Sequence, residues 1–371
     1  MKKLRIFYGF DKNLASSFDM GGKDIWTVNI HDTLVDMGHD LVSFDYDLGE
    51  FFKHLEKTIE SHQEYAKKHR NEVVAEFLRQ IRAAHEKEPI DMLLSYFYDH
   101  FMTPEAIEEV KKMGILAVNY NCNASYQLEL ISEVSPAFDY CLTVEDFRFD
   151  DYKALGANAI YFQEGANPKY YKPCDVPKEY EVIFIGQCYG DRPDHIRYLL
   201  DQGIDIKCFG PNWDKVMATP MKKLKNLFYK IIGKKKKVKP LLPSSIIGKV
   251  LPFDEMIKTY SKAKIAINFG TCGETHLTGQ RVTQIRLRDF EAPMCGVFYL
   301  TEDNAELKNF YKSDKELIFY NDKEDLSDKI KYYLANDNER EKIAKAGRDR
   351  AIKEHSWEKR FEKCFKEIGV A

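Results

Sequence analysis

The sequence lacks three features that would assign it to a specialised class of protein. Its eight cysteines include no Cys-x-x-Cys pair and have no histidine at metal-ligand spacing, which excludes a disulfide scaffold and indicates a reduced, cytoplasmic chain. No stretch reaches the roughly 18 consecutive apolar residues of a membrane span, and the N-terminal apolar run ends at Asp11, too early for a signal peptide. We therefore expect a soluble protein that is at most peripheral to the inner face of a membrane.

Acidic residues are also missing from one long segment. The 371-residue chain has 56 Lys and Arg against 59 Asp and Glu, a formal charge of −3. Residues 215–253 nevertheless hold 11 lysines and no acid, so the rest of the chain carries −14. The 44% of hydrophobic residues excludes disorder and, at about 100–200 residues per domain, the length predicts two packed cores.

Short apolar runs alternate with longer amphipathic segments along the whole chain. This alternation predicts strands joined by helices in parallel sheets that are covered on both faces. The expected strands are 4–8, 40–46, 92–97, 116–119, 140–144 and 159–162, and then 181–185, 206–209, 265–268 and 297–300. The expected helices include 51–87, 193–202, 253–262 and a series from 323 to 369. The fold class is therefore α/β, with two doubly wound, Rossmann-like domains and a ligand-binding cleft between them.

The domain boundary is expected where Gly and Pro residues interrupt any regular element, at 165–178. We assign an N-terminal domain to 1–170 and a C-terminal domain to 171–355, with a basic insertion at 215–249. The last segment, 356–371, is expected to form a separate C-terminal helix.

Two glycine turns follow predicted strands. Gly21 and Gly22 stand just before a helix, where paired glycines let backbone N–H groups approach an anion; an ordinary turn is the alternative. The strand at 181–185 runs into Gly186-Gln187-Cys188-Tyr189-Gly190-Asp191-Arg192-Pro193, in which the proline suits the first turn of a helix. Such a turn favours a phosphate, and a plain connection between strand and helix is the alternative.

The strongest signal lies between Gln280 and Thr301. If this segment is helical from about Thr283, then Gln284, Arg288 and Glu291 share one face, because they are three or four residues apart. Arg286 and Arg288 would add positive charge for a diphosphate, and the Glu291 carboxylate could accept both hydroxyls of a ribose. A solvated surface charge is the alternative for either arginine.

Together these segments resemble a family. The stretches Gly186–Arg192, Phe209–Trp213, Tyr260–Phe269 and Arg288–Gly296, with the tail around His355-Ser-Trp357, are similar to GT-B glycosyltransferases of the bacterial spore-maturation-protein group. The resemblance implies a nucleotide-sugar donor on the C-terminal domain, an acceptor on the N-terminal domain, and a last helix that crosses back to the N-terminal domain. It also implies that Glu291 contacts the donor ribose, and that Arg192 and Arg288, with Arg286 as a third candidate, neutralise the diphosphate.

One position departs from the family. The best-known retaining members have a glutamate eight residues before the second one, and here that position is Thr283. The sugar and the stereochemical course are therefore open. An inverting reaction needs a base for the acceptor hydroxyl, and His100, just past a predicted strand, is the first choice, with His31 as the second. A loop histidine without a role is the alternative.

The resemblance implies a hexosyltransferase that moves a sugar from a nucleoside diphosphate to a glycan, lipid-linked or protein acceptor in cell-surface glycan synthesis. Because this fold stabilises the leaving group with arginines, lysines and helix N-termini, no metal and no cofactor are expected. The alternatives are a nucleotide-sugar epimerase of the same fold and, because of Thr283, a catalytically silent domain that recruits partners.

The basic insertion carries its own pattern. Apolar residues from Met221 to Ile232 recur at three- and four-residue spacings, and lysines surround them from Lys222 to Lys239. A basic amphipathic helix of this kind favours an anionic membrane surface. The alternative is a stripe that packs on its own domain. Nucleic acid is not expected as a partner, because the run lacks arginines and the rest of the chain is acidic.

Overall fold

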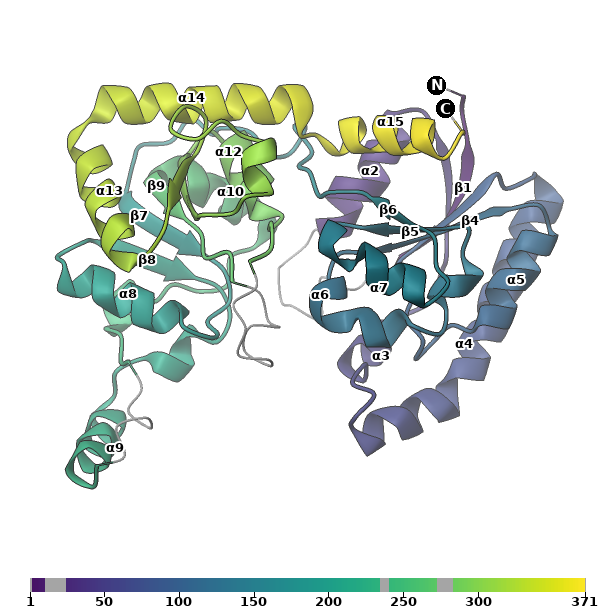
Figure 1. Ribbon diagram of the computed structural model, residues 1–371, viewed down its shortest axis with the longest axis horizontal. Coiled ribbons are helices and arrows are strands. Elements are labelled where there is room, and N and C mark those ends of the chain that lie inside the picture. Colours follow the sequence, from purple (N-terminus) through teal and green to yellow (C-terminus); the bar gives the residue numbers. More distant parts are fainter. Residues whose placement is uncertain (1, 11–24, 234–239, 272–282, 371) are drawn as a thin grey trace. The chain divides into compact units, whose positions relative to one another are not determined.

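The computed structural model describes residues 2–10, 25–233, 240–271 and 283–370 (Figure 1). The chain packs into two compact units. Unit 1 comprises the described residues up to Asn167 together with those from Ser356 onward, and unit 2 is Pro168–His355. None of the helices in the described ranges is long and apolar enough to cross a membrane.

Unit 1 is built on a six-stranded sheet in the order β2-β1-β3-β4-β5-β6, in which every neighbouring pair is parallel. The strands are β1 Arg5–Gly9, β2 Asp40–Ser43, β3 Met92–Ser95, β4 Leu116–Asn121, β5 Tyr140–Thr143 and β6 Ala159–Tyr161. The helices include α2 Asp32–Asp36, α3 Gly49–Lys53, α4 Glu60–Lys87, α5 Pro104–Lys112, α6 Ala124–Gln127 and α7 Phe149–Ala154. Central strands such as β3 are buried throughout because helices cover both faces of a parallel sheet.

The last helix of the chain, α15 (Trp357–Glu367), packs on unit 1. The Ser356 side chain caps it by accepting a hydrogen bond from the Lys359 backbone N–H, 3.2 Å away. Its Trp357 is fully buried and stands edge-on to Tyr120, with ring centroids 6.1 Å apart. The C-terminal helix thus belongs to the core of unit 1, which is otherwise built from the N-terminal half of the chain.

Unit 2 repeats the scheme with a five-stranded sheet in the order β11-β10-β9-β7-β8, again parallel throughout. Its strands are β7 Tyr180–Ile185, β8 Ile206–Phe209, β9 Ala263–Ile267, β10 Phe298–Glu302 and β11 Ile318–Tyr320. Its described helices include α8 Arg192–Asp201, α9 Pro220–Ile231, α10 Phe253–Lys262, α12 Arg288–Met294, α13 Lys323–Ala335 and α14 Asp337–Glu354. The predicted class, two doubly wound parallel sheets, is confirmed.

One predicted element begins in the wrong place. The helix expected from about Thr283 starts only at Arg288, so Gln284 does not share a helical face with Arg288 and Glu291. Instead, Thr283 forms a bridge with Thr271, and the Gln284 backbone N–H donates to the Gly270 carbonyl at 2.9 Å. These bonds tie residues 283–284 to the loop that follows β9, which keeps them out of the helix.

Candidate functional site

The turns after β7 and β8 touch through their backbones. The Gly186 N–H donates to the Phe209 carbonyl at 2.8 Å, and the Trp213 indole N–H donates to the Gly186 carbonyl at 2.8 Å. Gly210 has φ +133°, and a Cβ atom built there would lie 2.4 Å from the Gly186 oxygen. Only glycine therefore fits at 210, because both its backbone angle and the close approach exclude a side chain.

Replacing Gly210 with alanine should separate these two turns. We expect a loss of unfolding free energy of about 2 kcal/mol or more, since the new Cβ meets backbone and the φ value is strained. Urea denaturation measures the change, and Gly203→Ala is a matched control, because Gly203 also has a positive φ but no atom within 4 Å of an added Cβ. Equal losses in the two variants would show that the contact between the turns contributes nothing.

Arg192, the first residue of α8, lies under the β7 turn. Its side chain is almost fully buried, at 2% exposure. It donates to the Gln187 carbonyl at 2.9 Å and to the Tyr189 hydroxyl at 2.8 Å, and its guanidinium lies 3.9 Å above the Tyr189 ring. The predicted turn residues Gly186, Gln187, Tyr189 and Arg192 thus form one cluster at the carboxyl end of β7.

Two further arginines join this cluster from the segment before α12 and from its first residue. Arg286 donates to the same Tyr189 hydroxyl at 3.2 Å and to the Thr271 carbonyl at 3.1 Å. Arg288 donates to the Asn268 side-chain oxygen at 3.0 Å, and an added Cβ on Gly186 would lie 3.1 Å from its Nη2. Three guanidinium groups therefore meet where β7 and β9 end.

These three arginines are held by neutral groups, and the Asp289 carboxylate next to Arg288 offsets part of their charge. Within the described part of the chain, Arg192, Arg286 and Arg288 form hydrogen bonds only to neutral oxygens and no ion pair. The buried Nε atoms of Arg192 and Arg286 have no partner there either. Burial, together with the like charges of Arg288 and Arg286, lowers the pKa of Arg192 to about 9, so the group stays cationic at pH 7. A cluster of one buried and two half-buried arginines without an ion pair is suited to an anionic ligand.

A network that the sequence did not reveal holds the arginine-bearing segment in place. Asp289, 1% exposed, accepts hydrogen bonds from Asn268 at 2.9 Å, from Tyr299 at 2.8 Å and from the Arg286 backbone N–H at 2.7 Å. Burial raises the pKa of Asp289, and these hydrogen bonds oppose that rise. Asn268 thus links Asp289 to Arg288. Two features of the sequence could have indicated this network. Asn268 is a polar residue that ends a predicted apolar strand, and Asp289 is an acidic residue between the functional candidates Arg288 and Glu291.

Glu291 lies one turn beyond Arg288 on α12 and is buried, at 4% exposure. Its Oε1 accepts a hydrogen bond from the Tyr171 hydroxyl, a partner that sequence analysis missed. Gln284 is also buried, but in the loop that precedes α12. Gly21 and Gly22 lie outside the described residues.

His100 lies in unit 1, beyond the carboxyl end of β3, and lines an open pocket of about 520 Å³. It is 5% exposed, and its Nδ1 has no hydrogen-bond partner among the described residues. Burial and the nearby cations Lys57 and Arg70 lower the pKa of His100 to about 4, so the ring is neutral at pH 7. The pocket lining is otherwise mostly polar: Lys57, Gln63, Ala66, Lys67, Arg70, Asn71, Asp99 and Glu133.

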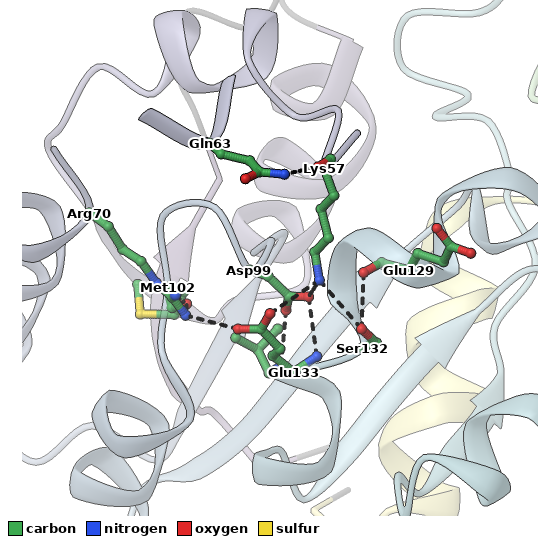
Figure 2. Close-up of polar contacts among 9 residues, drawn as sticks. Lys57, Gln63, Arg70, Asp99, Met102, Glu129, Ser132 and Glu133 are labelled. Carbon is green, nitrogen blue, oxygen red and sulfur yellow. Dashed lines mark hydrogen bonds and ion pairs between the residues drawn. The ribbon is translucent and has the colours of Figure 1, made fainter. Parts of the chain in front are cut away.

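Figure 2 shows how charged side chains are arranged around this pocket. Lys57 reaches Asp99 at 2.7 Å and Glu133 at 3.3 Å, and Arg70 approaches Glu133 at 3.6 Å. Asp99 is fixed further by the backbone N–H groups of Glu133 and Val134, at 3.1 and 3.0 Å. The pocket therefore presents both hydrogen-bond donors and acceptors, as recognition of a hydroxyl-rich molecule requires. No cluster of His, Cys, Asp and Glu suited to a metal ion occurs among the described residues.

Comparisons with known proteins bear on the fold and on the class of protein. Residues 194–366 match the family model described as "Glycosyl transferase-like", while no curated protein sequence matches the chain. A sucrose-phosphate synthase from Thermosynechococcus elongatus superposes with a TM-score of 0.59 at 11% identity over 100% of both chains. An alpha-glucosyltransferase in complex with UDP-glucose and DNA containing an abasic site gives a TM-score of 0.63 at 13% identity, over 99% of this chain and 100% of that one. The chain has the GT-B fold.

A further GT-B neighbour is a glycosyltransferase from Rickettsia africae ESF-5, with a TM-score of 0.58 and 13% identity over 99% of this chain and 98% of that one. The family model and the GT-B fold together support a glycosyltransferase of this type. Neither comparison identifies the spore-maturation-protein group, so that finer resemblance stays a prediction.

Proposed function

We propose that the protein transfers a sugar from a nucleoside-diphosphate sugar to a hydroxylated acceptor. The observation that carries the proposal is the cluster of Arg192, Arg286 and Arg288 beside the Gly186 turn, where three cations form no ion pair within the described residues. A diphosphate supplies the matching charge and can accept several guanidinium hydrogen bonds at once. The ligands of the solved neighbours, which include UDP and UDP-glucose, support the same class of donor.

In the proposed reaction the acceptor oxygen forms a bond to the anomeric carbon of the sugar. The bond from that carbon to the diphosphate oxygen breaks, and the nucleoside diphosphate leaves with the electron pair. Arg288 and Arg192 would stabilise the negative charge that develops on the diphosphate, because they are already fixed by Asn268 and Tyr189 and need little reorganisation. Arg286, which donates to the same Tyr189 hydroxyl as Arg192, would add a third positive charge.

Glu291 is the proposed ligand of the donor ribose. Its buried carboxylate follows Arg288 by one helical turn, so ribose and diphosphate would bind to the same short helix. The Tyr171 hydroxyl, which now donates to Glu291, would hold the carboxylate in position. The motif likeness supports placement in the spore-maturation-protein-like group, with an acceptor used in cell-surface glycan synthesis.

The pocket around His100 is the proposed acceptor site, with His100 as the base that takes the acceptor proton in an inverting reaction. The unpartnered Nδ1 and the mixed charges of Lys57 and Asp99 support this assignment. Because the pKa of His100 is about 4, kcat/KM should rise with pH through about 4 and stay level above about 6.

The rise in kcat/KM with pH on the acidic side of the profile should disappear in the His100→Gln variant and persist in His31→Gln. Steady-state rates between pH 3.5 and 8 would show the difference. A rise that persists unchanged in His100→Gln would exclude His100 as the base.

We also expect transfer to be insensitive to chelators, because the arginines would supply the charge that a metal supplies in other transferases. Rates with and without excess EDTA should agree within about twofold. A rate that falls to background with EDTA and recovers with Mg²⁺ or Mn²⁺ would contradict the metal-independent mechanism.

A donor screen tests the function itself. UDP-, GDP-, ADP- and dTDP-sugars would be incubated with the protein and the loss of donor followed by chromatography, with and without sugar acceptors. A transferase releases nucleoside diphosphate and is accelerated by acceptor. Isomerised donor without acceptor would indicate an epimerase, and binding without any turnover would indicate a silent, partner-recruiting domain.

A further inference from the structure

Helix α9 exposes a stripe of large apolar side chains, which we call the α9 stripe. The exposures are 81% for Met221, 68% for Leu224, 53% for Leu227, 56% for Phe228 and 74% for Ile231. At about 100° per residue these positions cover roughly 120° of the helix circumference. The alternative in which the stripe packs on its own domain is therefore wrong. An amphipathic helix normally turns such a stripe toward the core.

The polar side of α9 faces unit 2 instead. Lys222, Asn226 and Tyr229 are only half-exposed, and the Lys222 ammonium donates to the carbonyls of Asp214 at 3.0 Å and Lys215 at 3.1 Å. Figure 1 shows the helix at the end of an excursion that leaves unit 2 after β8. The helix is therefore turned with the stripe away from unit 2, which is the opposite of the orientation that would bury the stripe.

The excursion is anchored where it leaves and re-enters the core. The Ala218 N–H donates to the Leu242 carbonyl at 2.8 Å, and the Leu242 N–H donates to the Val216 carbonyl at 2.9 Å. Leu242 is fully buried in the hydrophobic core of unit 2. The exposed stripe therefore belongs to a helix whose connection to the core is hydrogen-bonded at both ends.

Positive charge borders the stripe on both sides. On a helical projection Lys223 and Lys225 fall just outside opposite edges of the stripe, and both are exposed. Residues 215–253 contain no acid, so no side chain of this segment offsets the lysines. Apolar side chains flanked by exposed lysines match the interface of an anionic bilayer, where the apolar groups enter the headgroup region and the ammonium groups reach lipid phosphates.

We propose that the α9 stripe with Lys223 and Lys225 docks the protein on an anionic membrane surface. The excess of positive charge selects an anionic bilayer over a neutral one, and the width of the stripe suits insertion along the membrane plane. Docking does not depend on transferase activity. Where the proposed function also holds, docking would favour an acceptor that carries a lipid.

Co-sedimentation of the full chain with vesicles tests the proposal. Vesicles of phosphatidylcholine with 30% phosphatidylserine should bind the protein, and pure phosphatidylcholine vesicles should bind it far less. Leu224→Ser with Phe228→Ser should lower the partition coefficient by about 100-fold, from the lost burial of two large apolar groups. Lys223→Gln with Lys225→Gln should lower it by about 20-fold. The matched control, Lys342→Gln with Lys345→Gln on α14, should leave it unchanged.

A second readout reports insertion directly. The native tryptophans Trp26, Trp213 and Trp357 are all buried, so the indole introduced by Phe228→Trp would be the exposed one. Its emission should shift to the blue on addition of phosphatidylserine vesicles and should be quenched by brominated lipid.

Two results would overturn the proposal. The first is failure of the wild-type chain to bind anionic vesicles at 50 mM salt. The second is a lipid-independent dimer, seen by ultracentrifugation, that Leu224→Ser with Phe228→Ser dissolves, because it would assign the stripe to a second copy of the chain. All substituted side chains are exposed, so the variants are expected to keep the wild-type melting temperature.

Discussion

Replacing Arg288 with alanine should lower kcat/KM for donor turnover by about 1000-fold. This is the usual effect of removing a preorganised protein charge that stabilises the transition state of a group transfer. Arg288 is held by Asn268 at 3.0 Å and lies against the Gly186 turn, so its charge is fixed before the donor binds. Arg288→Lys should recover only part of the loss, because a lysine keeps the charge but cannot form the planar, two-pronged contact of a guanidinium.

Arg197→Ala is the matched control for this prediction. Arg197 lies on α8 and pairs with Asp201 on the surface, with a side-chain exposure of 42%. Its loss should leave turnover within about twofold of wild type, because an exposed ion pair contributes little. Similar activity of Arg288→Ala and Arg197→Ala would remove Arg288 from the mechanism.

Replacing Glu291 with alanine should weaken donor binding by about 100-fold, the value of two hydrogen bonds between ribose hydroxyls and a carboxylate. The dissociation constant of the nucleotide, measured by calorimetry, reports this directly. Tyr171→Phe should have a smaller effect, because it removes only the group that positions the carboxylate.

Glu341→Ala, an exposed position on α14, controls for the loss of one negative charge. Unchanged nucleotide affinity in Glu291→Ala would refute the ribose assignment. A loss of affinity accompanied by a large fall in melting temperature would instead assign Glu291 a structural role, because the carboxylate is buried.

The strands were predictable because each is a short apolar run in a sheet covered on both faces. The strand expected at 206–209 is observed with those bounds, and the one expected at 181–185 gains only Tyr180. The strand expected at 40–46 ends at Ser43. The Phe44 N–H still donates to the Tyr8 carbonyl of β1 at 2.9 Å, but both backbone groups of Asp45 bond to the Gln80 side chain instead, at 2.9 and 3.0 Å. The short strand β11, Ile318–Tyr320, was not predicted.

The arginine cluster was partly predictable because Gly186 to Arg192 is one local motif. The rest of the site depends on contacts between distant positions. Tyr171 and Glu291 are 120 residues apart, and Asn268 and Asp289 are 21 apart, so no local periodicity reports either pair. Likewise, the sequence shows that α9 is amphipathic but not which side faces unit 2, because that is set by the anchoring of residues 216–218 on Leu242.

Calorimetric titration of UDP, GDP, ADP and dTDP into the wild-type chain and into Arg192→Ala tests the central claim most directly. Arg192 is 2% exposed and donates to Tyr189, so the melting temperature of each variant is measured in parallel, with Arg197→Ala as the folded control. We predict that at least one nucleoside diphosphate binds wild type and Arg197→Ala with a micromolar dissociation constant, and that a folded Arg192→Ala binds it at least 30-fold more weakly. Binding of none of the four to wild type, or equal binding to Arg192→Ala, would contradict a diphosphate site at this cluster.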